Sequence, residues 1–361
     1  MNLYKTLLRP ILFRMSADSA HEWTIKSSSL ISGWQAATTL VDRMYGFQDP
    51  ALEQQILGLT FPNPVGLAAG FDKNGLTVPL MQALGFGFVE IGSITAEASP
   101  GNPKPRSFRL PEDRSIINRM GLNNEGAKTV AMRLSKLSTV RIPLGINIAK
   151  THNPLIHGDK ALEDYRISFE MAKPIADYIT LNISCPNTED GKTFENPESL
   201  EALLDVLEIG KNAADPPVLV KISADIETPV LDELIDLCES KAVSGYVAVN
   251  TSSGRDHLHS AEDVIRACGN GGLSGAAIRT NSTEKISRIR EKTKGGKLII
   301  GVGGIMSSED AIEKLMAGAN LLQIYTGLVY EGPALVRRIN HGILEALKKE
   351  NKTHIYQLTA G

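Results

Sequence analysis

Apolar residues recur along most of this chain in short β-rich runs that alternate with stretches of helical periodicity. The short runs predict eight strands, at residues 64–68, 88–93, 144–148, 178–182, 218–222, 245–250, 298–302 and 321–325. The stretches between and after them predict helices at residues 75–84, 124–137, 162–173, 200–212, 230–240, 283–292, 310–317 and 334–348. Eight strands followed by helices favour an α/β fold, a (β/α)8 TIM barrel with long loops, over a doubly wound sheet.

Two insertions interrupt this rhythm. Residues 99–117 follow the second strand and contain turn residues and short β-like pieces, whereas residues 252–275 follow the sixth strand and are rich in Gly, Ser and His. Both follow the carboxyl ends of predicted strands, the end at which barrels of this type carry their active sites. We therefore expect both insertions near the chemistry.

The first 45 residues differ from the rest of the chain. Leu7, Leu8, Ile11, Leu12 and Met15 recur at helical spacing, and Ser16 or Asp18 could cap a second helix. Basic residues outnumber acidic ones here by five to three, and both tryptophans of the chain, Trp23 and Trp34, lie in this segment. The pattern predicts a helical hairpin, which would either lie on a membrane interface or form a lid on the main domain. We expect three parts: the extension at residues 1–45, the barrel at 46–350 and a tail at 351–361.

Composition limits the class of protein. Apolar residues make up 42% of the 361 positions and charged residues 22%, which allows a sizeable core and does not indicate disorder. The net charge of −3 argues against general nucleic-acid binding. Three widely spaced cysteines make a disulfide framework or a zinc site a poor explanation and favour a reducing compartment. No apolar run reaches the length of a membrane span, and no secretory signal is visible, so the protein is expected to be soluble or to lie on a membrane surface.

Polar residues gather where the predicted strands end. These are A-A-G-F-D-K at residues 68–73, Asn147, Asn182, Lys221, Asn250 and Thr251. Amides and lysines without a cluster of His or carboxylate residues indicate a site that hydrogen-bonds a flat polar ligand and holds no metal. Any one of these residues alone could equally be an ordinary loop residue.

Glycines follow the last two strands, in I-G-V-G-G-I at residues 300–305 and Q-I-Y-T-G at 323–327, and G-G-L-S-G stands at 271–275. Glycines in these places typically form a phosphate cradle in this fold, where backbone N–H groups face an anion. They could also be plain turns. The cradle interpretation predicts a phosphorylated cofactor or substrate.

The heptapeptide N-I-S-C-P-N-T, residues 182–188, runs from a strand into a loop and would display Asn182, Cys185 and Asn187 at the strand end. Taken alone, it could be a simple strand terminus with a buried free cysteine.

Taken together, eleven motifs of the chain resemble dihydroorotate dehydrogenase. They are G-L-A-A-G-F-D-K-N-G (66–75), G-F-G-F-V-E-I-G-S-I-T (85–95), G-N-P-K-P-R-S-F-R-L (101–110), I-N-R-M-G-L-N-N (117–124), G-I-N-I (145–148), N-I-S-C-P-N-T, V-K-I (220–222), N-T (250–251), G-G-L-S-G, I-I-G-V-G-G-I (299–305) and Q-I-Y-T-G. The resemblance implies an FMN-dependent barrel that oxidises dihydroorotate to orotate in pyrimidine synthesis. Residues 7–23 resemble the membrane-associating extension of the class 2 branch, which implies that a membrane quinone re-oxidises the flavin.

The resemblance also implies roles for individual residues. Cys185 matches the catalytic base, which would remove the C5 proton of dihydroorotate while the C6 hydride leaves. Orotate-binding positions are matched by Lys73, Asn118, Arg119, Met120, Gly121, Leu122, Asn182, Asn187, Asn250 and Thr251. FMN-binding positions are matched by Ala69, Gly70, Phe71, Asp72, Lys73, Ser93, Asn147, Asn182, Lys221, Val249, Gly275, Gly303, Gly304, Tyr325 and Thr326. Positions along the quinone tunnel are matched by His21, Arg106 and Tyr325.

The chain departs from the class 2 pattern at several positions. Cys185 replaces the usual Ser, Leu122 the usual Phe and Val249 a Thr, and E-D-G-K-T-F at residues 189–194 replaces a P-G-L-R loop. Cys185 and Leu122 are class 1 choices, so a soluble acceptor such as fumarate or NAD is the alternative to a quinone. An FMN-binding protein without turnover and an oxidoreductase acting on uracil-type rings are two further hypotheses. We expect a monomer that lies peripherally on the cytoplasmic side of the inner membrane.

Overall fold

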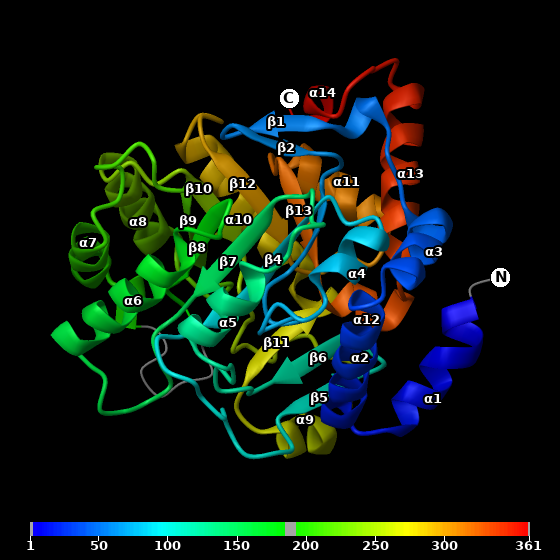
Figure 1. The fold of residues 1–361 in the computed structure, drawn as a ribbon, viewed down its shortest axis with the longest axis horizontal. Coiled ribbons are helices and arrows are strands. Elements are labelled where there is room, and N and C mark those ends of the chain that lie inside the picture. The colour runs from blue at the N-terminus through cyan, green and yellow to red at the C-terminus, as the bar shows by residue number, and fades with distance from the viewer. Residues whose placement is uncertain (1–2, 185–192, 360–361) are drawn as a thin grey trace.

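Eight parallel strands form a closed barrel at the centre of the molecule, with helices around it (Figure 1). The structure is a computed structural model and describes residues 3–184 and 193–359. The strands follow one another around the barrel in the order β10-β12-β13-β3-β4-β7-β8-β9. They are β3 (Val65–Leu67), β4 (Phe88–Ile94), β7 (Leu144–Ile148), β8 (Tyr178–Asn182), β9 (Val218–Ile222), β10 (Gly245–Ala248), β12 (Leu298–Val302) and β13 (Leu321–Ile324). The predicted barrel and all eight predicted strands are confirmed.

The helices outside the barrel pack their apolar sides onto the strands and form the main core. They are α4 (Val78–Ala83), α5 (Ala127–Leu134), α6 (Asp159–Ala172), α7 (Pro197–Val206), α8 (Thr228–Ser240), α10 (Arg279–Lys292), α11 (Ser308–Met316), α12 (Thr326–Glu331) and α13 (Leu335–Lys349). The helix predicted from residue 75 begins only at Val78. The reason is local, because the Asp72 carboxylate accepts hydrogen bonds from the N–H groups of Leu76 (3.0 Å) and Thr77 (2.6 Å) and holds this segment in a loop.

A hairpin of β1 (Gln54–Ile56) and β2 (Leu59–Phe61) adds to a second, smaller core inside the barrel. Phe61 of the hairpin meets Phe88 edge to face, with ring centroids 5.5 Å apart. The other buried members of this core are Tyr178, Leu219, Val247, Leu298, Ile300 and Leu321. Four of the buried residues are the first residues of their strands, namely Phe88, Tyr178, Leu298 and Leu321. This apolar core therefore occupies the amino-terminal half of the barrel. The carboxyl-terminal half is left for polar residues.

The two insertions meet in a single antiparallel sheet. Residues 99–117 contribute β5 (Ser107–Leu110) and the start of β6 (Ser115–Asn118), and the second insertion contributes α9 (Glu262–Cys268) and β11 (Gly272–Gly275). The strand order is β11-β6-β5, and Gly272 pairs with Asn118. The β-like pieces of the first insertion were predicted from the sequence, but this pairing was not, because it joins segments about 150 residues apart.

The N-terminal extension is helical, as predicted, but it contains one helix more than the expected hairpin. It comprises the π-helical turn η1 (Tyr4–Leu8), α1 (Arg9–Arg14), α2 (Ala17–Ser32) and α3 (Gln35–Tyr45). Ser16 caps α2, and its side chain accepts a hydrogen bond from the Ser19 N–H at 3.1 Å. The N-cap of α3 is Trp34, which gives no side-chain cap, so this helix start carries no sequence signal.

The extension is fastened to the barrel by polar contacts on one side. The Tyr4 hydroxyl donates to the Val329 carbonyl at 2.6 Å, and Arg109 of β5 donates to the Leu12 carbonyl at 2.9 Å. The extension also exposes apolar side chains, namely Leu7, Leu8, Ile11, Trp23, Leu30, Trp34, Leu40 and Met44. Within the described residues, no helix is both long and apolar enough to cross a membrane.

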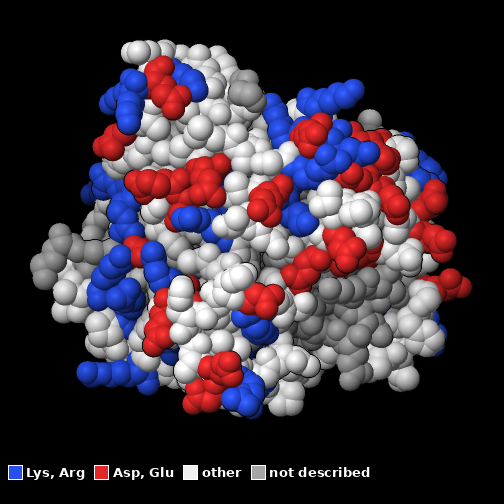
Figure 2. Space-filling view, turned by 180° about the vertical axis from the view of Figure 1, so that it is seen from behind, with Lys and Arg blue, Asp and Glu red and all other residues white. Residues whose placement is uncertain are grey.

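The C-terminal segment also packs against the barrel. Ile355 is buried and donates its N–H to the Ala51 carbonyl at 2.9 Å, and α14 (Tyr356–Thr359) contacts α11. On the face opposite to that of Figure 1, basic and acidic side chains are interspersed, in keeping with the small net charge (Figure 2).

The glycines of the barrel strands allow aromatic rings to fill its interior, which gives a test of the fold. Gly145 pairs with Tyr178 on the neighbouring strand, and a Cβ at Gly145 would lie 2.1 Å from the ring. We expect Gly145→Ala to destabilise the protein by about 1–3 kcal/mol, as overpacking of cores typically does. Gly33→Ala is the control, because its Cβ would meet no atom closer than 3.6 Å. Chemical denaturation would measure both, and equal stabilities would contradict the packing described here.

Candidate active site

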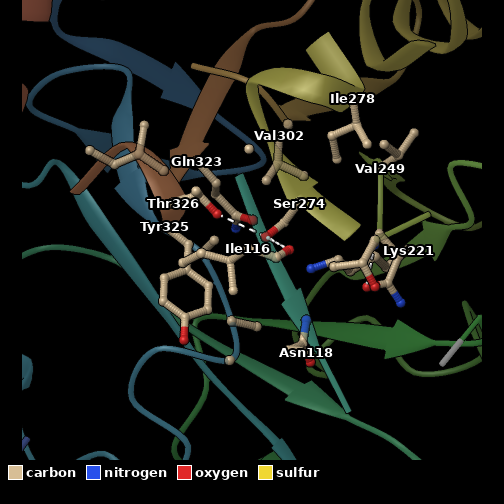
Figure 3. A pocket seen from close by; sticks show the side chains of 18 of the residues that line it. Ile116, Asn118, Lys221, Val249, Ser274, Ile278, Val302, Gln323, Tyr325 and Thr326 are labelled. Atoms are coloured by element: carbon tan, nitrogen blue, oxygen red, sulfur yellow. Dashed lines mark hydrogen bonds between the residues drawn. The ribbon is translucent and has the colours of Figure 1, made fainter. Parts of the chain in front are cut away.

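A large cavity opens where the carboxyl ends of the barrel strands meet the sheet β11-β6-β5. It encloses about 1140 Å³ of open space, including solvent at its mouth. Tyr325 and Lys221 lie on opposite sides of it in Figure 3, and Ser274 and Thr326 are joined by a hydrogen bond of 2.9 Å. The position agrees with the face at which barrels of this type carry their sites.

Three glycines shape one end of the cavity. Gly275, Gly303 and Gly304 all line it and have φ values of +104°, +125° and +77°, which glycine adopts without strain. A Cβ at Gly304 would lie 2.6 Å from the Arg279 Cα, and one at Gly275 would lie 2.6 Å from the Arg114 carbonyl oxygen. The backbone is therefore packed closely around this end of the cavity, where α12 begins at Thr326, and the arrangement suits a phosphate group.

Amide side chains and a lysine form the floor of the cavity. Asn182, the last residue of β8, pairs in register with Lys221 of β9, so both side chains reach the cavity from adjacent strands. Asn250 donates to the Asn182 Oδ1 at 3.0 Å and to the Ser184 carbonyl at 2.9 Å. Asn118 reaches the cavity from β6 of the inserted sheet. Together these groups offer both donors and acceptors, as a ring with alternating N–H and C=O groups requires.

The structure brings most of the predicted site residues to this one cavity. Those that line it are Ala69, Gly70, Lys73, Ser93, Asn118, Met120, Leu122, Asn182, Lys221, Val249, Asn250, Thr251, Gly275, Gly303, Gly304, Tyr325 and Thr326. Cys185 and Asn187 lie outside the described residues.

The remaining predicted residues do not line the cavity. Arg119 points elsewhere and donates to the Pro105 carbonyl, while Asp72 caps the loop before α4 and Phe71 packs in the core. Asn147 is fully buried beneath Ser93, from which it accepts a hydrogen bond of 2.5 Å. Gly121 has a φ of +68° and packs against Asn102.

Several lining residues were not predicted from the sequence. Ser107, Ile116 and Ser274 come from the inserted sheet. Ile278 follows β11, Val302 and Ile305 lie at and after the end of β12, and Gln323 lies within β13. Gln323 stands in the Q-I-Y-T-G motif and could have been found there, since a polar residue inside a buried strand requires a partner. The serines of the insertions had no such signal.

The N-terminal extension meets the site at His21. Its imidazole lies against Phe71 and Tyr325, with ring centroids 5.5 Å and 6.4 Å away. Arg106 is buried nearby, and its backbone N–H donates to the Asp18 carboxylate of α2 at 2.9 Å. The three residues assigned to a quinone path thus come from three separate segments, α2, the first insertion and β13–α12.

Burial and positive charge control the protonation of this region. Burial, together with Lys73 and Arg106, lowers the pKa of His21 to about 3, so its ring is neutral at physiological pH. Burial and the charge of Arg106 lower the pKa of Lys73 to about 8. Burial raises the pKa of Tyr325 to about 12, so its hydroxyl keeps its proton.

Comparison with known proteins identifies the family. The family model for dihydroorotate dehydrogenase matches residues 51–347. The chain belongs to the dihydroorotate dehydrogenase family. The resemblance seen in the sequence is thereby confirmed.

Relatives of this family match nearly the whole chain. Dihydroorotate dehydrogenase (quinone) of Gloeobacter violaceus is 43% identical over 365 residues, which cover 99% of each protein. The enzyme of the same name from a Synechococcus species is 43% identical over 356 residues, covering 96% of this chain and 93% of that protein. Among solved structures, DHODH from Eimeria tenella in complex with ferulenol superposes with a TM-score of 0.82 at 29% identity, covering 97% of this chain and 98% of that one.

The cavity fits the FMN that quinone-type dihydroorotate dehydrogenases use. The glycines that line the cavity suit the phosphate, and the amides and lysine of its floor suit a polar ring system. The buried Oε1 of Gln323 has no hydrogen-bond partner among the described residues, which indicates that a ligand supplies one.

The buried imidazole predicts how stability depends on pH. Because the pKa of His21 is lowered in the folded state, unfolding takes up a proton as the pH falls below about 6.5, and His21 costs stability between pH 6.5 and 3. From pH 7 to 5 this loss is on the order of 2 kcal/mol.

His21→Gln cannot titrate and should lose less stability over this interval than the wild type, as measured by melting temperature at both pH values. His157→Gln, at an exposed histidine, is the control. Equal pH sensitivity of His21→Gln and the wild type would contradict a buried neutral imidazole.

Proposed function

We propose that this protein oxidises (S)-dihydroorotate to orotate in the synthesis of UMP, with FMN bound in the cavity and a membrane quinone as the final electron acceptor. The observation that carries the proposal is the family match over residues 51–347, together with quinone-type relatives that cover almost the entire chain, extension included. When bound, FMN supplies the acceptor for the substrate hydride. The residues of the chain have to bind, orient and deprotonate the substrate.

Orotate has a carboxylate and a pyrimidine dione, and the cavity offers partners for both. Lys73 and Lys221 supply positive charge, and Asn118, Asn182 and Asn250 supply carboxamides that can donate and accept at once. Met120, Leu122 and Thr251 complete this part of the lining. This set supports an acidic pyrimidine as substrate over an uncharged uracil-type ring, because positively charged side chains attract a carboxylate.

Cys185 is proposed as the base that takes the C5 proton. A thiol has an ordinary pKa of about 8.5, much closer to physiological pH than a serine hydroxyl, so it needs less activation to act as a base. Asn187 is proposed as a further substrate contact.

The N-terminal extension is proposed to admit the quinone from a membrane. The extension exposes apolar side chains, among them Trp23 and Trp34 and the leucines Leu7, Leu8 and Leu30. His21 of this extension lies against Tyr325, which lines the cavity, and Arg106 is joined to the same helix through Asp18. We propose peripheral binding to the cytoplasmic side of the inner membrane and a monomeric protein.

The acceptor can be tested directly. With dihydroorotate as donor, we expect turnover with a ubiquinone analogue and no comparable turnover with fumarate or NAD, each assayed separately. Reduction of an artificial dye serves as the control for an intact flavin site. Turnover with fumarate but not with the quinone would contradict the proposed acceptor, while failure of the flavin to bleach anaerobically with dihydroorotate would favour a binding protein without turnover.

The role of Cys185 predicts a change in rate and pH profile. Cys185→Ser should keep FMN and orotate binding, slow flavin reduction by at least about tenfold and move its pH optimum upward, because the hydroxyl is a far weaker acid than the thiol. Anaerobic stopped-flow reduction by dihydroorotate across pH measures this.

Cys268→Ser is the matched control, since its Sγ donates to the Val264 carbonyl at 3.2 Å and a hydroxyl can do the same. If Cys185→Ser left rate and pH profile unchanged, Cys185 would not be the base.

A further inference from the structure

Glu90 places a carboxylate inside the barrel that the proposed chemistry does not use. It stands in the middle of β4, is fully buried, and lies directly beneath the residues that line the cavity. A buried carboxylate requires hydrogen-bond donors, so the neighbouring side chains have to direct their N–H or O–H groups toward it.

Four side chains from three strands donate to this carboxylate. Its Oε1 accepts from Asn147 Nδ2 at 2.9 Å. Its Oε2 accepts from Gln323 Nε2 at 2.8 Å, from Thr180 Oγ1 at 3.1 Å and from the Tyr178 hydroxyl at 3.2 Å. Burial and the nearby Glu90 raise the pKa of Tyr178 well above its ordinary value, so that hydroxyl keeps its proton and donates.

The contact with Asn147 sets the direction of a chain of hydrogen bonds. Since Asn147 turns its NH2 group to Glu90, its Oδ1 faces Ser93, which donates to it at 2.5 Å. The Ser93 Oγ then accepts from Asn182 Nδ2 at 2.9 Å, and the Asn182 Oδ1 accepts from Asn250 at 3.0 Å. The orientation of the cavity-lining amides therefore follows from the carboxylate.

The far end of this chain is fixed independently. Asn250 donates to the Ser184 carbonyl at 2.9 Å and accepts from the Thr251 N–H at 2.9 Å, and backbone groups cannot exchange these roles. An amide chain held at both ends cannot invert without losing hydrogen bonds at one of them.

Gln323 is the second amide oriented by Glu90. Its Nε2 is taken by the carboxylate, which leaves its Oε1 on the other side, and this buried oxygen has no partner among the described residues. Gln323 lines the cavity, at the position labelled in Figure 3. Its oxygen is thus held as an acceptor for the ligand.

We propose that Glu90 is a positioning residue of the FMN site, which fixes Gln323 with its oxygen available to a hydrogen-bond donor of FMN. The inference rests on the proposed binding of FMN in this cavity. Glu90 itself does not line the cavity and acts through Gln323 and Asn147.

The substitution Glu90→Gln keeps the size of the side chain and changes only its hydrogen-bonding groups, so it tests the effect on the orientation of the neighbouring amides. A carboxamide has one oxygen and one NH2 group, so it cannot accept from both Asn147 and Gln323. Because Asn250 opposes inversion of the asparagine chain, the glutamine would turn its oxygen to Asn147 and its NH2 group to Gln323. The Gln323 carboxamide would then rotate and direct its NH2 group, in place of its oxygen, toward the hydrogen-bond donor of FMN.

The measurement is the dissociation constant of FMN, obtained from the fluorescence of free flavin after ultrafiltration of diluted holoprotein. We expect Glu90→Gln to weaken FMN binding at least tenfold. The double variant Glu90→Gln/Gln323→Glu exchanges the carboxylate and the carboxamide, restores an acceptor at residue 323, and should bind FMN within threefold of the wild type. Thr180→Val removes one donor from the same Oε2 without changing any orientation and should stay within twofold.

Two results would overturn the proposal: unchanged FMN affinity in Glu90→Gln, or a double variant as weak as the single one. A purely structural role predicts that Thr180→Val and Glu90→Gln weaken binding in step with their melting temperatures. Should Glu90→Gln fail to fold, Gln323→Met keeps the other three donors on Glu90 and should lose FMN affinity to the same extent; wild-type affinity in that variant would equally overturn the proposal. The response of the wild-type flavin spectrum to orotate tests the proposed function separately.

Discussion

A carboxylate enclosed in a barrel requires hydrogen-bond donors from the strands around it. Glu90 is such a carboxylate, buried inside the barrel. The amino-terminal half of the barrel is filled by aromatic and aliphatic side chains, and Glu90 is fully buried next to them. Strands β7, β8 and β13 each contribute a donor, which links neighbouring and non-neighbouring strands through one group. The polar layer between the apolar core and the cavity is thus a hydrogen-bonded unit, and the cavity floor is its upper surface.

The N-terminal extension depends on a similar buried contact at its junction with the barrel. The Asp18 carboxylate of α2 receives the backbone N–H of Arg106, and Arg109 reaches the carbonyl of Leu12. Both arginines belong to the segment that forms β5, so the extension is attached to the inserted sheet as well as to the barrel helices. This attachment brings His21 against Tyr325, and the surface that exposes tryptophans is therefore connected to the cavity by packed side chains.

Local patterning was enough to predict the barrel, because strands buried on both faces appear as short apolar runs and their helices as amphipathic stretches. Local patterning did not predict α3, because its N-cap residue Trp34 provides no side-chain cap. It did not predict the pairing of β6 with β11 either, because no local sequence signal indicates which distant strands pair. The polar strand ends Asn182, Lys221 and Asn250 were predicted and do meet in one cavity. A role for Glu90 was not predicted, although a single charged residue within the apolar run F-V-E-I-G-S-I indicates a buried polar network. Family resemblance supplied the individual roles, which neither periodicity nor composition could provide.

The inserted sheet has a consequence for how this protein can change. Asn118 lies on β6, and Ser274 and Gly275 lie on β11, so the strand that carries a cavity-lining amide is paired with the strand that carries a cavity-lining glycine. A shift of one residue in their pairing would turn Ile116 and Asn118 away from the cavity together. Lengthening or exchanging one insertion would leave the other with an unpaired strand edge. The two insertions, far apart in the sequence, therefore form one structural unit. Transferring the sheet to another barrel would require both insertions.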